Sequence, residues 1–174
     1  MKIAITGAHR VGKTTLAEKL AESLTDHEVM QEAYYELQEH GASFSEVPTM
    51  DEYIDQLDHS LRQAYSSTRN VIYDRCPIDH LAYIHALDDR MDISEKYHKV
   101  KNAVNELDLL IFVPVETIDR VPCGKSDLPL LRLRVNEILN EWVTALDVEV
   151  IEVNGSVEDR AEEVLAIVQR NSRN

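Results

Sequence analysis

One stretch near the start of the chain constrains its fold more than any other feature. Residues 7–15, GAHRVGKTT, match the pattern G-x-x-x-x-G-K-[ST]. The apolar run at residues 2–6 predicts a short buried strand, and apolar residues then recur at helical spacing over residues 14–24. The stretch therefore forms the turn from a strand into a helix, which is the setting that the pattern requires.

A turn of this kind binds anions. Gly7 and Gly12 allow the backbone to bend until successive N–H groups point inward, and the following helix adds the positive end of its dipole. We expect Lys13 to reach the β- and γ-phosphates of ATP and the Thr14 hydroxyl to ligate Mg²⁺. The other loop residues that we expect to line or flank the phosphates are His9, Arg10, Val11 and Thr15. The alternative, a turn with a chance lysine, leaves the agreement of strand, spacing and helix unexplained.

Composition limits the class of protein. With 174 residues, 44% of them hydrophobic, the chain fits one domain over residues 1–174. A formal net charge of −14 repels phosphate backbones and disfavours general nucleic-acid binding; a solubilising surface or a high-salt habitat would explain it. Cys76 and Cys123 are too few for a disulfide framework and lack the spacing of a metal site. No stretch is apolar enough for a signal peptide or a membrane span, so we expect a cytosolic protein without a membrane partner. The oligomeric state is left open.

Strand and helix patterns alternate along the chain. Strands are predicted at residues 2–6, 28–30, 71–73, 109–113 and 148–153. Helices are predicted at residues 14–24, 33–40, 50–65, 78–87, 94–106, 128–146 and 157–168. Thr49 with Glu52 has the form of a capping box, and Ser156 is placed to cap the last helix. The alternation predicts an α/β fold, a five-stranded parallel sheet with helices on both faces, and a ligand at the carboxyl ends of the strands.

Two acidic residues follow strands that end at this same edge. Asp74 ends the third strand, where a carboxylate linked to the metal would lie; the alternative is a strand that simply ends in an aspartate. Glu32 follows the second strand and could accept a proton from an attacking hydroxyl. A solvated loop carboxylate is an equal alternative for Glu32.

These residues together resemble the P-loop nucleoside and nucleotide kinases, and more closely the branch of AAA-like ATP-binding proteins that includes ribosylnicotinamide kinase domains. The resemblance covers nearly the whole chain and is carried by residues 7–15, Glu32, residues 74–77 and a basic segment before a long helix. In deoxynucleoside and thymidylate kinases the arginine of the acidic-Arg pair lies near the acceptor, which implies that role for Arg75. In the deoxynucleoside kinases the glutamate after the second strand is the base, which implies the same for Glu32.

The resemblance also implies a lid at about residues 114–134. Closing lids commonly bring arginines to the transferred phosphoryl group. The candidates are Arg120, Lys125, Arg132 and Arg134, each of which could instead be a solvated charge on a helix face. Residues 125–127 with Arg132 resemble the R-S-x-D pattern with a downstream arginine, except that Lys125 replaces the first arginine. We therefore select Arg132 as the lid residue that contacts the transferred phosphoryl group. Kinases of this fold contact adenine after the last strand, which implies that role for Asn154, where a helix cap is the alternative.

The sequence thus predicts a phosphotransferase that uses ATP and Mg²⁺ to phosphorylate a small nucleoside- or nucleotide-like acceptor. The rival is a nucleoside triphosphatase or ATP-sensing module that acts through a protein partner. A GTPase switch is disfavoured because no guanine-reading N-K-x-D occurs, and an assembly-type AAA+ motor would need a longer chain with a second helical domain. Aromatic residues that could stack on an acceptor base are Tyr34, Tyr35, Tyr53 and Tyr83, but aromatics at these spacings more often belong to the core, so they indicate no particular substrate.

Overall fold

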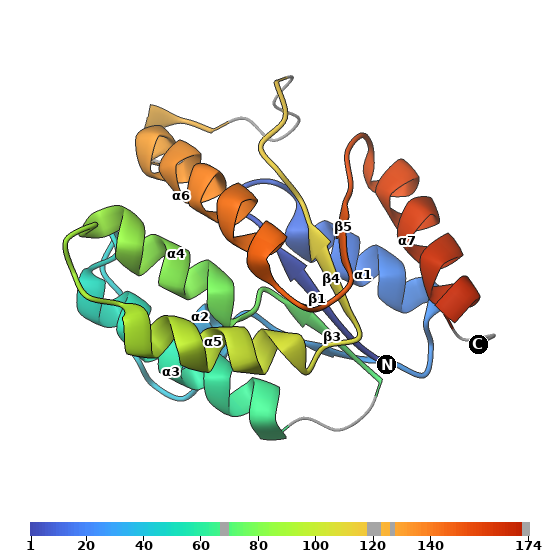
Figure 1. Cartoon of the computed structure of the whole chain (residues 1–174), viewed down its shortest axis with the longest axis horizontal. Coiled ribbons are helices and arrows are strands. Elements are labelled where there is room, and N and C mark those ends of the chain that lie inside the picture. The colour runs from blue at the N-terminus through green and yellow to red at the C-terminus, as the bar shows by residue number, and fades with distance from the viewer. Residues whose placement is uncertain (67–69, 118–122, 126–127, 172–174) are drawn as a thin grey trace.

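A parallel five-stranded sheet forms the centre of the molecule. The computed structural model describes residues 1–66, 70–117, 123–125 and 128–171 (Figure 1). The strands follow the order β2-β3-β1-β4-β5, and all neighbouring pairs are parallel. Their bounds are β1 (Lys2–Thr6), β2 (Glu28–Met30), β3 (Val71–Asp74), β4 (Leu109–Phe112) and β5 (Val150–Glu152). The predicted α/β class and the parallel sheet are confirmed.

Helices cover both faces of this sheet. Their bounds are α1 (Lys13–Ser23), α2 (Ala33–Glu39), α3 (Met50–Ser66), α4 (Pro77–Leu87), α5 (Ser94–Asn105), α6 (Pro129–Trp142) and α7 (Val157–Asn171). In Figure 1, α1 and α7 lie together on one side, while α3, α4, α5 and α6 lie on the other. Of these, α4 packs against each of the other three. The helices on the α4 side provide additional surface on which a second ligand site could form.

The segment between α6 and β5 differs from the prediction. The helix expected over residues 128–146 ends at Trp142 and tightens into a 3₁₀ turn, η2 (Val143–Ala145). Beyond the turn, the Asp147 N–H donates to Asn105 Oδ1 at 3.1 Å, and Asn105 Nδ2 donates to Asp147 Oδ2 at 3.1 Å. These bonds tie the connection to the end of α5, and β5 begins only at Val150. The tie joins residues far apart in sequence, so the local pattern did not reveal it.

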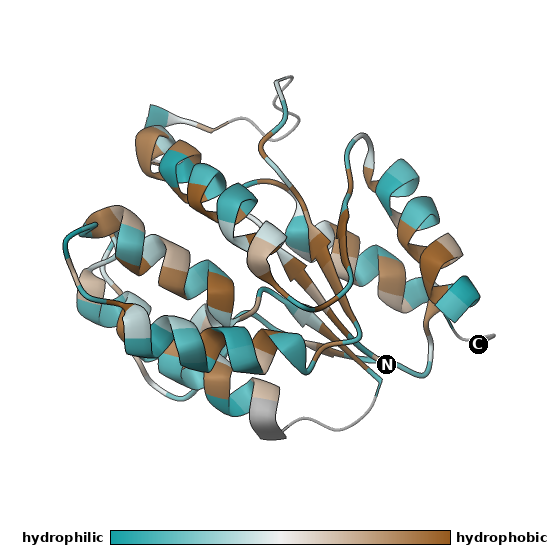
Figure 2. Ribbon diagram, viewed as in Figure 1, coloured by the Kyte–Doolittle hydropathy of each residue, from teal (hydrophilic) through white to brown (hydrophobic). Residues whose placement is uncertain are grey.

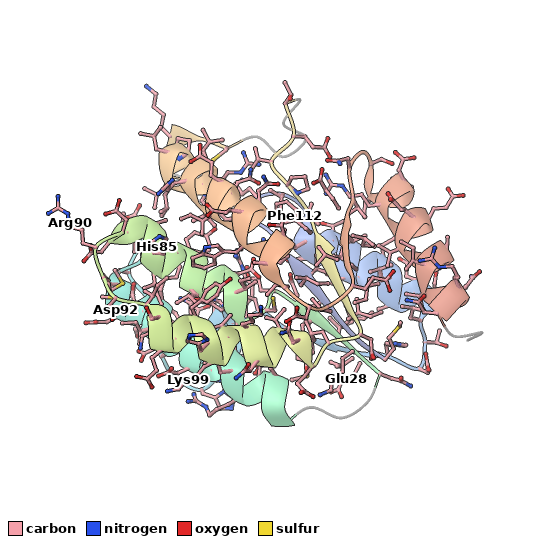
Figure 3. All side chains as sticks on the ribbon, viewed as in Figure 1. Glu28, His85, Arg90, Asp92, Lys99 and Phe112 are labelled. Carbon is pink, nitrogen blue, oxygen red and sulfur yellow. The ribbon has the colours of Figure 1, made fainter. Side chains whose placement is uncertain are left out.

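The core lies where apolar strands meet the apolar faces of the helices. Figure 2 shows hydrophobic residues concentrated on the strands and on inward helix faces. β3 and β4 are buried along their full length, as near-continuous apolar strands of a covered parallel sheet should be. Figure 3 shows Phe112 within the sheet, whereas Arg90, Asp92 and Lys99 extend from the periphery. None of the described helices is long and apolar enough to cross a lipid bilayer.

The predicted helix caps are confirmed. Glu52 accepts the Thr49 N–H at 2.6 Å, and its own N–H donates to Thr49 Oγ1 at 3.4 Å. Ser156 and Asp159 repeat this exchange at the start of α7, with distances of 3.0 and 3.1 Å. Each pair satisfies N–H groups that a helix start leaves without partners.

Candidate functional site

The phosphate loop, residues 7–15, joins β1 to α1 at the carboxyl edge of the sheet. β1 pairs with β3 on one side and β4 on the other, which makes this edge a topological switch point. Gly7 is required by close approach, because a Cβ there would lie 2.4 Å from the carbonyl oxygen of Val113. Gly12 is required by conformation, because its φ of 87° lies in the left-handed region.

Lys13 lies beneath this loop rather than in solvent. Its side chain is 5% exposed, and Nζ donates to the carbonyl oxygen of Ala8 at 2.6 Å. Burial, aided by the positive charge of Arg75, lowers the pKa of Lys13 to about 8. Three nearby carboxylates oppose that shift, those of Asp79, Glu32 and Asp74. The structure therefore holds a poorly compensated cation at the loop, where an anionic ligand would stabilise it.

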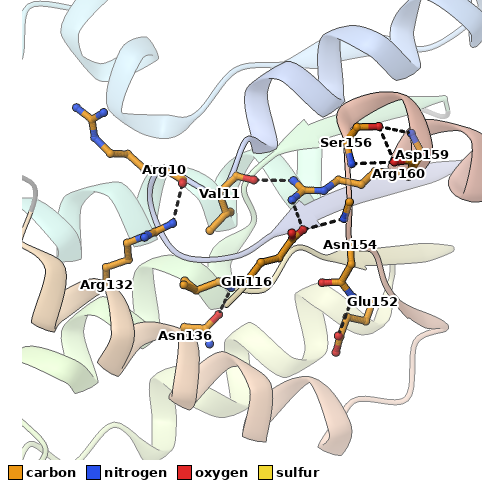
Figure 4. Close-up of polar contacts among 12 residues, drawn as sticks. Arg10, Val11, Glu116, Arg132, Asn136, Glu152, Asn154, Ser156, Asp159 and Arg160 are labelled. Atoms are coloured by element: carbon orange, nitrogen blue, oxygen red, sulfur yellow. Dashed lines mark hydrogen bonds and ion pairs between the residues drawn. The ribbon is translucent and has the colours of Figure 1, made fainter. Parts of the chain in front are cut away.

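Two arginines from distant helices brace the loop from outside (Figure 4). Arg132, on α6, is 4% exposed; its Nε donates to the His9 carbonyl oxygen and its Nη2 to the Arg10 carbonyl oxygen, each at 2.9 Å. Arg160, on α7, is 6% exposed and donates from Nη1 to the Val11 carbonyl oxygen at 2.7 Å. Charge-assisted bonds of this kind fix the positions of three loop carbonyls, those of His9, Arg10 and Val11.

Asp79 anchors the loop from inside. This fully buried carboxylate accepts the Gly7 N–H through Oδ1 at 2.8 Å and the Cys76 N–H through Oδ2 at 3.0 Å. The second bond belongs to the start of α4, so Asp79 connects that helix to the phosphate loop. Burial raises the pKa of Asp79, although Lys13 and Arg75 act against that shift. Tyr83 Oη adds a further tie as it accepts the His9 N–H at 2.8 Å.

Asp74 and Thr14 face the same cavity, which we name the Thr14 cavity. Its volume is about 400 Å³, and its lining includes Thr14, Gln31, Glu32, Tyr35 and Asp74. Asp74 is buried, yet Oδ1 has no hydrogen-bond partner among the described residues. Those residues contain no cluster of three or more His, Cys, Asp or Glu side chains that could hold a metal alone. One hydroxyl and one unpartnered carboxylate oxygen instead fit Mg²⁺, which usually keeps waters and takes its other ligands from phosphates.

A second cavity, which we name the Arg75 cavity, lies on the α3 and α4 side of Glu32. Its volume is about 230 Å³, and its lining includes Glu32, Tyr53, Gln56, Arg75, His80 and Tyr83. Arg75 Nε lies 2.6 Å from Glu32 Oε1, and the Arg75 guanidinium lies 5.6 Å from the centre of the Tyr83 ring. Burial alone would raise the pKa of Glu32, but the charges of Arg75 and Lys13 outweigh it and hold that pKa below its ordinary value. Glu32 is therefore ionised at neutral pH.

The aromatic side chains divide between the two cavities. Tyr53 and Tyr83 stack with ring centres 4.7 Å apart and planes within 9° of parallel, and both line the Arg75 cavity. Tyr34 lines the same cavity and stacks on Phe44 at 4.7 Å. Tyr35 lines the Thr14 cavity instead.

The other basic lid candidates do not reach the loop in the described residues. Arg134 is exposed on α6 and pairs with Glu137 at 3.4 Å, so it is a solvated charge on a helix face. Lys125 is exposed. Arg120 and positions 126–127 of the motif after Lys125 lie outside the described residues. Of the three candidates that the structure describes, Arg132 is the one that it brings to the phosphate loop.

The connection after β5 meets the loop through a carboxylate. Glu116 Oε1 accepts the Gly155 N–H at 2.8 Å and pairs with Arg160 Nη2 at 2.7 Å (Figure 4). Asn154 is exposed, and its Nδ2 donates to Glu152 Oε1 at 3.1 Å. Residue 154 thus begins a connection that Glu116 and Arg160 tie to the phosphate loop.

Several site residues escaped the sequence reading. The helix that carries Asp79 and His80 was predicted from its apolar spacing, which does not mark either residue as functional. Gln56 likewise lies in α3 without any local pattern that distinguishes it. The capping position three residues after Cys76 was the available signal for Asp79. Arg160 and Glu116 had no local signal, because Arg160 contacts a residue 149 positions away.

Comparisons with known proteins agree with this geometry. A family model described as an AAA domain matches residues 2–160, and a comparison with curated proteins gives no match. Deoxyadenosine kinase from M. mycoides with bound dATP has a similar structure, with a TM-score of 0.69 and 19% identity over 97% of this chain and 99% of that one. Thymidylate kinase from Candida albicans follows, with a TM-score of 0.64 and 16% identity over 98% of this chain and 91% of that one.

A third similar structure is NadR protein in complex with NR, with a TM-score of 0.70 and 18% identity. The match covers 97% of this chain but 50% of that one, so the present chain spans about half the length of NadR. At these identities the likeness establishes a common fold, while the family model extends over most of the chain. The protein therefore belongs to the AAA domain family, within the fold shared by the P-loop nucleoside and nucleotide kinases.

Proposed function

We propose that this protein is a phosphotransferase that moves the γ-phosphate of ATP to a small nucleoside- or nucleotide-like acceptor. One observation carries the proposal: Glu32 lines both the Thr14 cavity and the Arg75 cavity. We infer that this carboxylate lies between the place for a phosphate donor and a second place for a ligand. A module that only hydrolyses or senses ATP has no need of the second cavity. The kinases of similar structure support the proposal at the level of fold.

On the donor side, the phosphate loop binds the phosphates of ATP. N–H groups at the start of α1 bind them, and Lys13 leaves the Ala8 carbonyl to contact the β- and γ-phosphates. Thr14 and Asp74 hold Mg²⁺, directly or through water, and the ion when bound neutralises charge on the phosphate oxygens. Asn154 and the connection after β5 contact the adenine. Glu116 and Arg160 fix the position of that connection relative to the phosphate loop.

On the acceptor side, Glu32 receives the proton of the attacking hydroxyl as the new P–O bond forms and the bond to ADP breaks. Its depressed pKa keeps it ionised, and Arg75 at 2.6 Å holds its orientation. Arg75 also contacts a polar part of the acceptor, and Glu32 contacts the same acceptor. Arg132 keeps the phosphate loop in shape through the His9 and Arg10 carbonyls and adds positive charge beside the transferred group.

The test is ADP release by the purified protein with Mg²⁺ and ATP, alone and with each member of a panel of nucleosides, nucleotides and ribosylnicotinamide. Stimulation by one class of acceptor, with a phosphorylated product found by mass spectrometry, is the expected result. Turnover that no acceptor changes would favour the nucleoside triphosphatase or sensing module. Lys13→Met should abolish this turnover, and Lys19→Met is its control, because Lys19 lies on the same helix but pairs with Glu22 on the surface.

A further inference from the structure

The Arg75 cavity has an unusual balance of charge for a site that would accept a nucleotide. Among its described lining residues, Arg75 is the one Lys or Arg side chain. Its guanidinium is already committed, with Glu32 at 2.6 Å and Asp79 at 4.0 Å. Glu46 at the exposed rim adds another carboxylate. A phosphate monoester carries a charge of about −1.5 to −2 at pH 7 and needs uncommitted cationic donors, so this lining disfavours a phosphorylated acceptor.

The same cavity has polar groups that await an uncharged partner. His80 is 1% exposed, and neither of its ring nitrogens has a hydrogen-bond partner among the described residues. A buried polar group left in this state destabilises the fold, because it has lost its bonds to water without replacement. Burial, together with the charge of Arg75, lowers the pKa of His80 to about 3, so the ring stays neutral and offers one donor and one acceptor. Gln56, also buried, adds an amide to the same lining.

The remaining lining supplies flat apolar surface. Tyr34, Tyr53 and Tyr83 all line the cavity, and because Tyr53 and Tyr83 stack on each other, an aromatic heterocycle would contact the outside of that pair rather than enter between the rings. A heterocyclic base carries hydrogen-bond donors and acceptors along its edge, which complements a neutral imidazole. Glu32, in the wall toward the Thr14 cavity, then faces the hydroxyl of the attached sugar.

We propose, resting on the function proposed above, that the acceptor is an uncharged nucleoside rather than a nucleotide, and that His80 hydrogen-bonds the edge of its base. His80 is then a specificity-determining residue. Two consequences follow. A 5′-phosphate on the same nucleoside weakens binding, and removal of the imidazole nitrogens lowers nucleoside affinity while it relieves the unbound protein of two unpartnered buried atoms.

The experiment measures binding separately from transfer. Isothermal titration calorimetry, with and without a non-hydrolysable ATP analogue, compares the common ribonucleosides and deoxyribonucleosides with their 5′-monophosphates. At least one nucleoside should bind, and its monophosphate should bind about tenfold more weakly or worse. His80→Phe should weaken the nucleoside by about tenfold or more and leave the urea midpoint equal or higher. The matched control is His85→Phe on the same helix, which keeps the aromatic contact with Trp142 and lies outside the cavity lining.

The outcomes separate this inference from the proposed function. Equal or tighter binding of the monophosphate, binding of no nucleoside, or unchanged nucleoside affinity in His80→Phe would overturn the inference. A monophosphate that is phosphorylated would overturn it while supporting a phosphotransferase. A nucleoside that binds through His80 but receives no phosphate would support the inference and contradict the proposed function.

Discussion

Lys13→Met should stabilise the ligand-free protein while it abolishes turnover. Lys13 is 5% exposed, and a fall in its pKa from 10.5 to about 8 means that the charged form costs about 3 kcal/mol in the folded state. Methionine keeps a long apolar side chain but removes the charge. Loss of the Nζ bond to the Ala8 carbonyl offsets about 1 kcal/mol of the gain. The variant should therefore be more stable than wild type by about 2 kcal/mol at pH 7.

The pH dependence has a defined sign. Below pH 8 both the folded and the unfolded states keep the Lys13 proton, so the full cost is present. Between pH 8 and 10.5 the folded state loses the proton first, the unfolded state binds more protons, and wild-type stability rises with pH. At pH 9.5 the Lys13 contribution should have fallen by about half. Lys13→Met lacks this component, so its stability advantage shrinks as pH rises.

Urea unfolding at pH 7 and pH 9.5 measures the effect on wild type, Lys13→Met and the surface control Lys19→Met. ATP with Mg²⁺ should raise the unfolding midpoint of wild type but not that of Lys13→Met, because the phosphates compensate the buried cation. A Lys13→Met protein that is less stable than wild type at pH 7, or whose stability difference is the same at both pH values, would refute the reasoning. Lys19→Met should lie within about 0.5 kcal/mol of wild type.

Four further substitutions probe separate parts of the site. Asp74→Asn should reduce Mg²⁺-dependent turnover much more than metal-free nucleotide binding; equal losses in titration and kinetics would indicate a structural aspartate. Arg132→Ala should lower kcat and also weaken ATP binding, because the loop carbonyls of His9 and Arg10 lose their donor; impaired folding alone in circular dichroism would contradict this. Glu32→Gln should reduce acceptor phosphorylation by about 10²- to 10⁴-fold while ATP titrations stay unchanged; wild-type rates across the accessible pH range would transfer the role of base to Asp74. Arg160→Met removes the ion pair with Glu116 and the bond to the Val11 carbonyl and should lower the free energy of unfolding by about 2 kcal/mol in urea, whereas a loss below about 0.5 kcal/mol would show that these contacts contribute little.

Local patterns predicted the elements of the fold because each element follows a short-range rule. The phosphate loop needs two glycines at fixed spacing, and the strand before it and the helix after it each show their own period. The caps at Thr49 and Ser156 are equally local, since each exchanges bonds with a residue three positions away. The predicted end of the helix over residues 128–146 was wrong. The connection that follows α6 is held by the bond between Asn105 and Asp147, which joins residues 42 positions apart and leaves no local pattern.

The same distinction between local and long-range contacts decides which site residues could be predicted. Asp74 and Glu32 could be placed because carboxyl ends of parallel strands meet at one edge. The outer brace Arg160 could not be placed, because a buried charge on an amphipathic helix has the same local pattern as a surface one, and the capping position of Asp79 did not reveal its bond to Gly7. Only the packing of α4 and α7 against the phosphate loop distinguishes them.

The most direct test of the central claim follows the γ-phosphate of ATP itself. Phosphorus NMR of a reaction that contains the protein, Mg²⁺, ATP and the acceptor selected by the binding experiment reports where that phosphate goes. We expect a phosphate monoester of the acceptor and ADP to grow in equal amounts, with little inorganic phosphate, and neither to grow with Lys13→Met. Inorganic phosphate as the main product, formed at the same rate with and without the acceptor, would show that the protein is not a phosphotransferase.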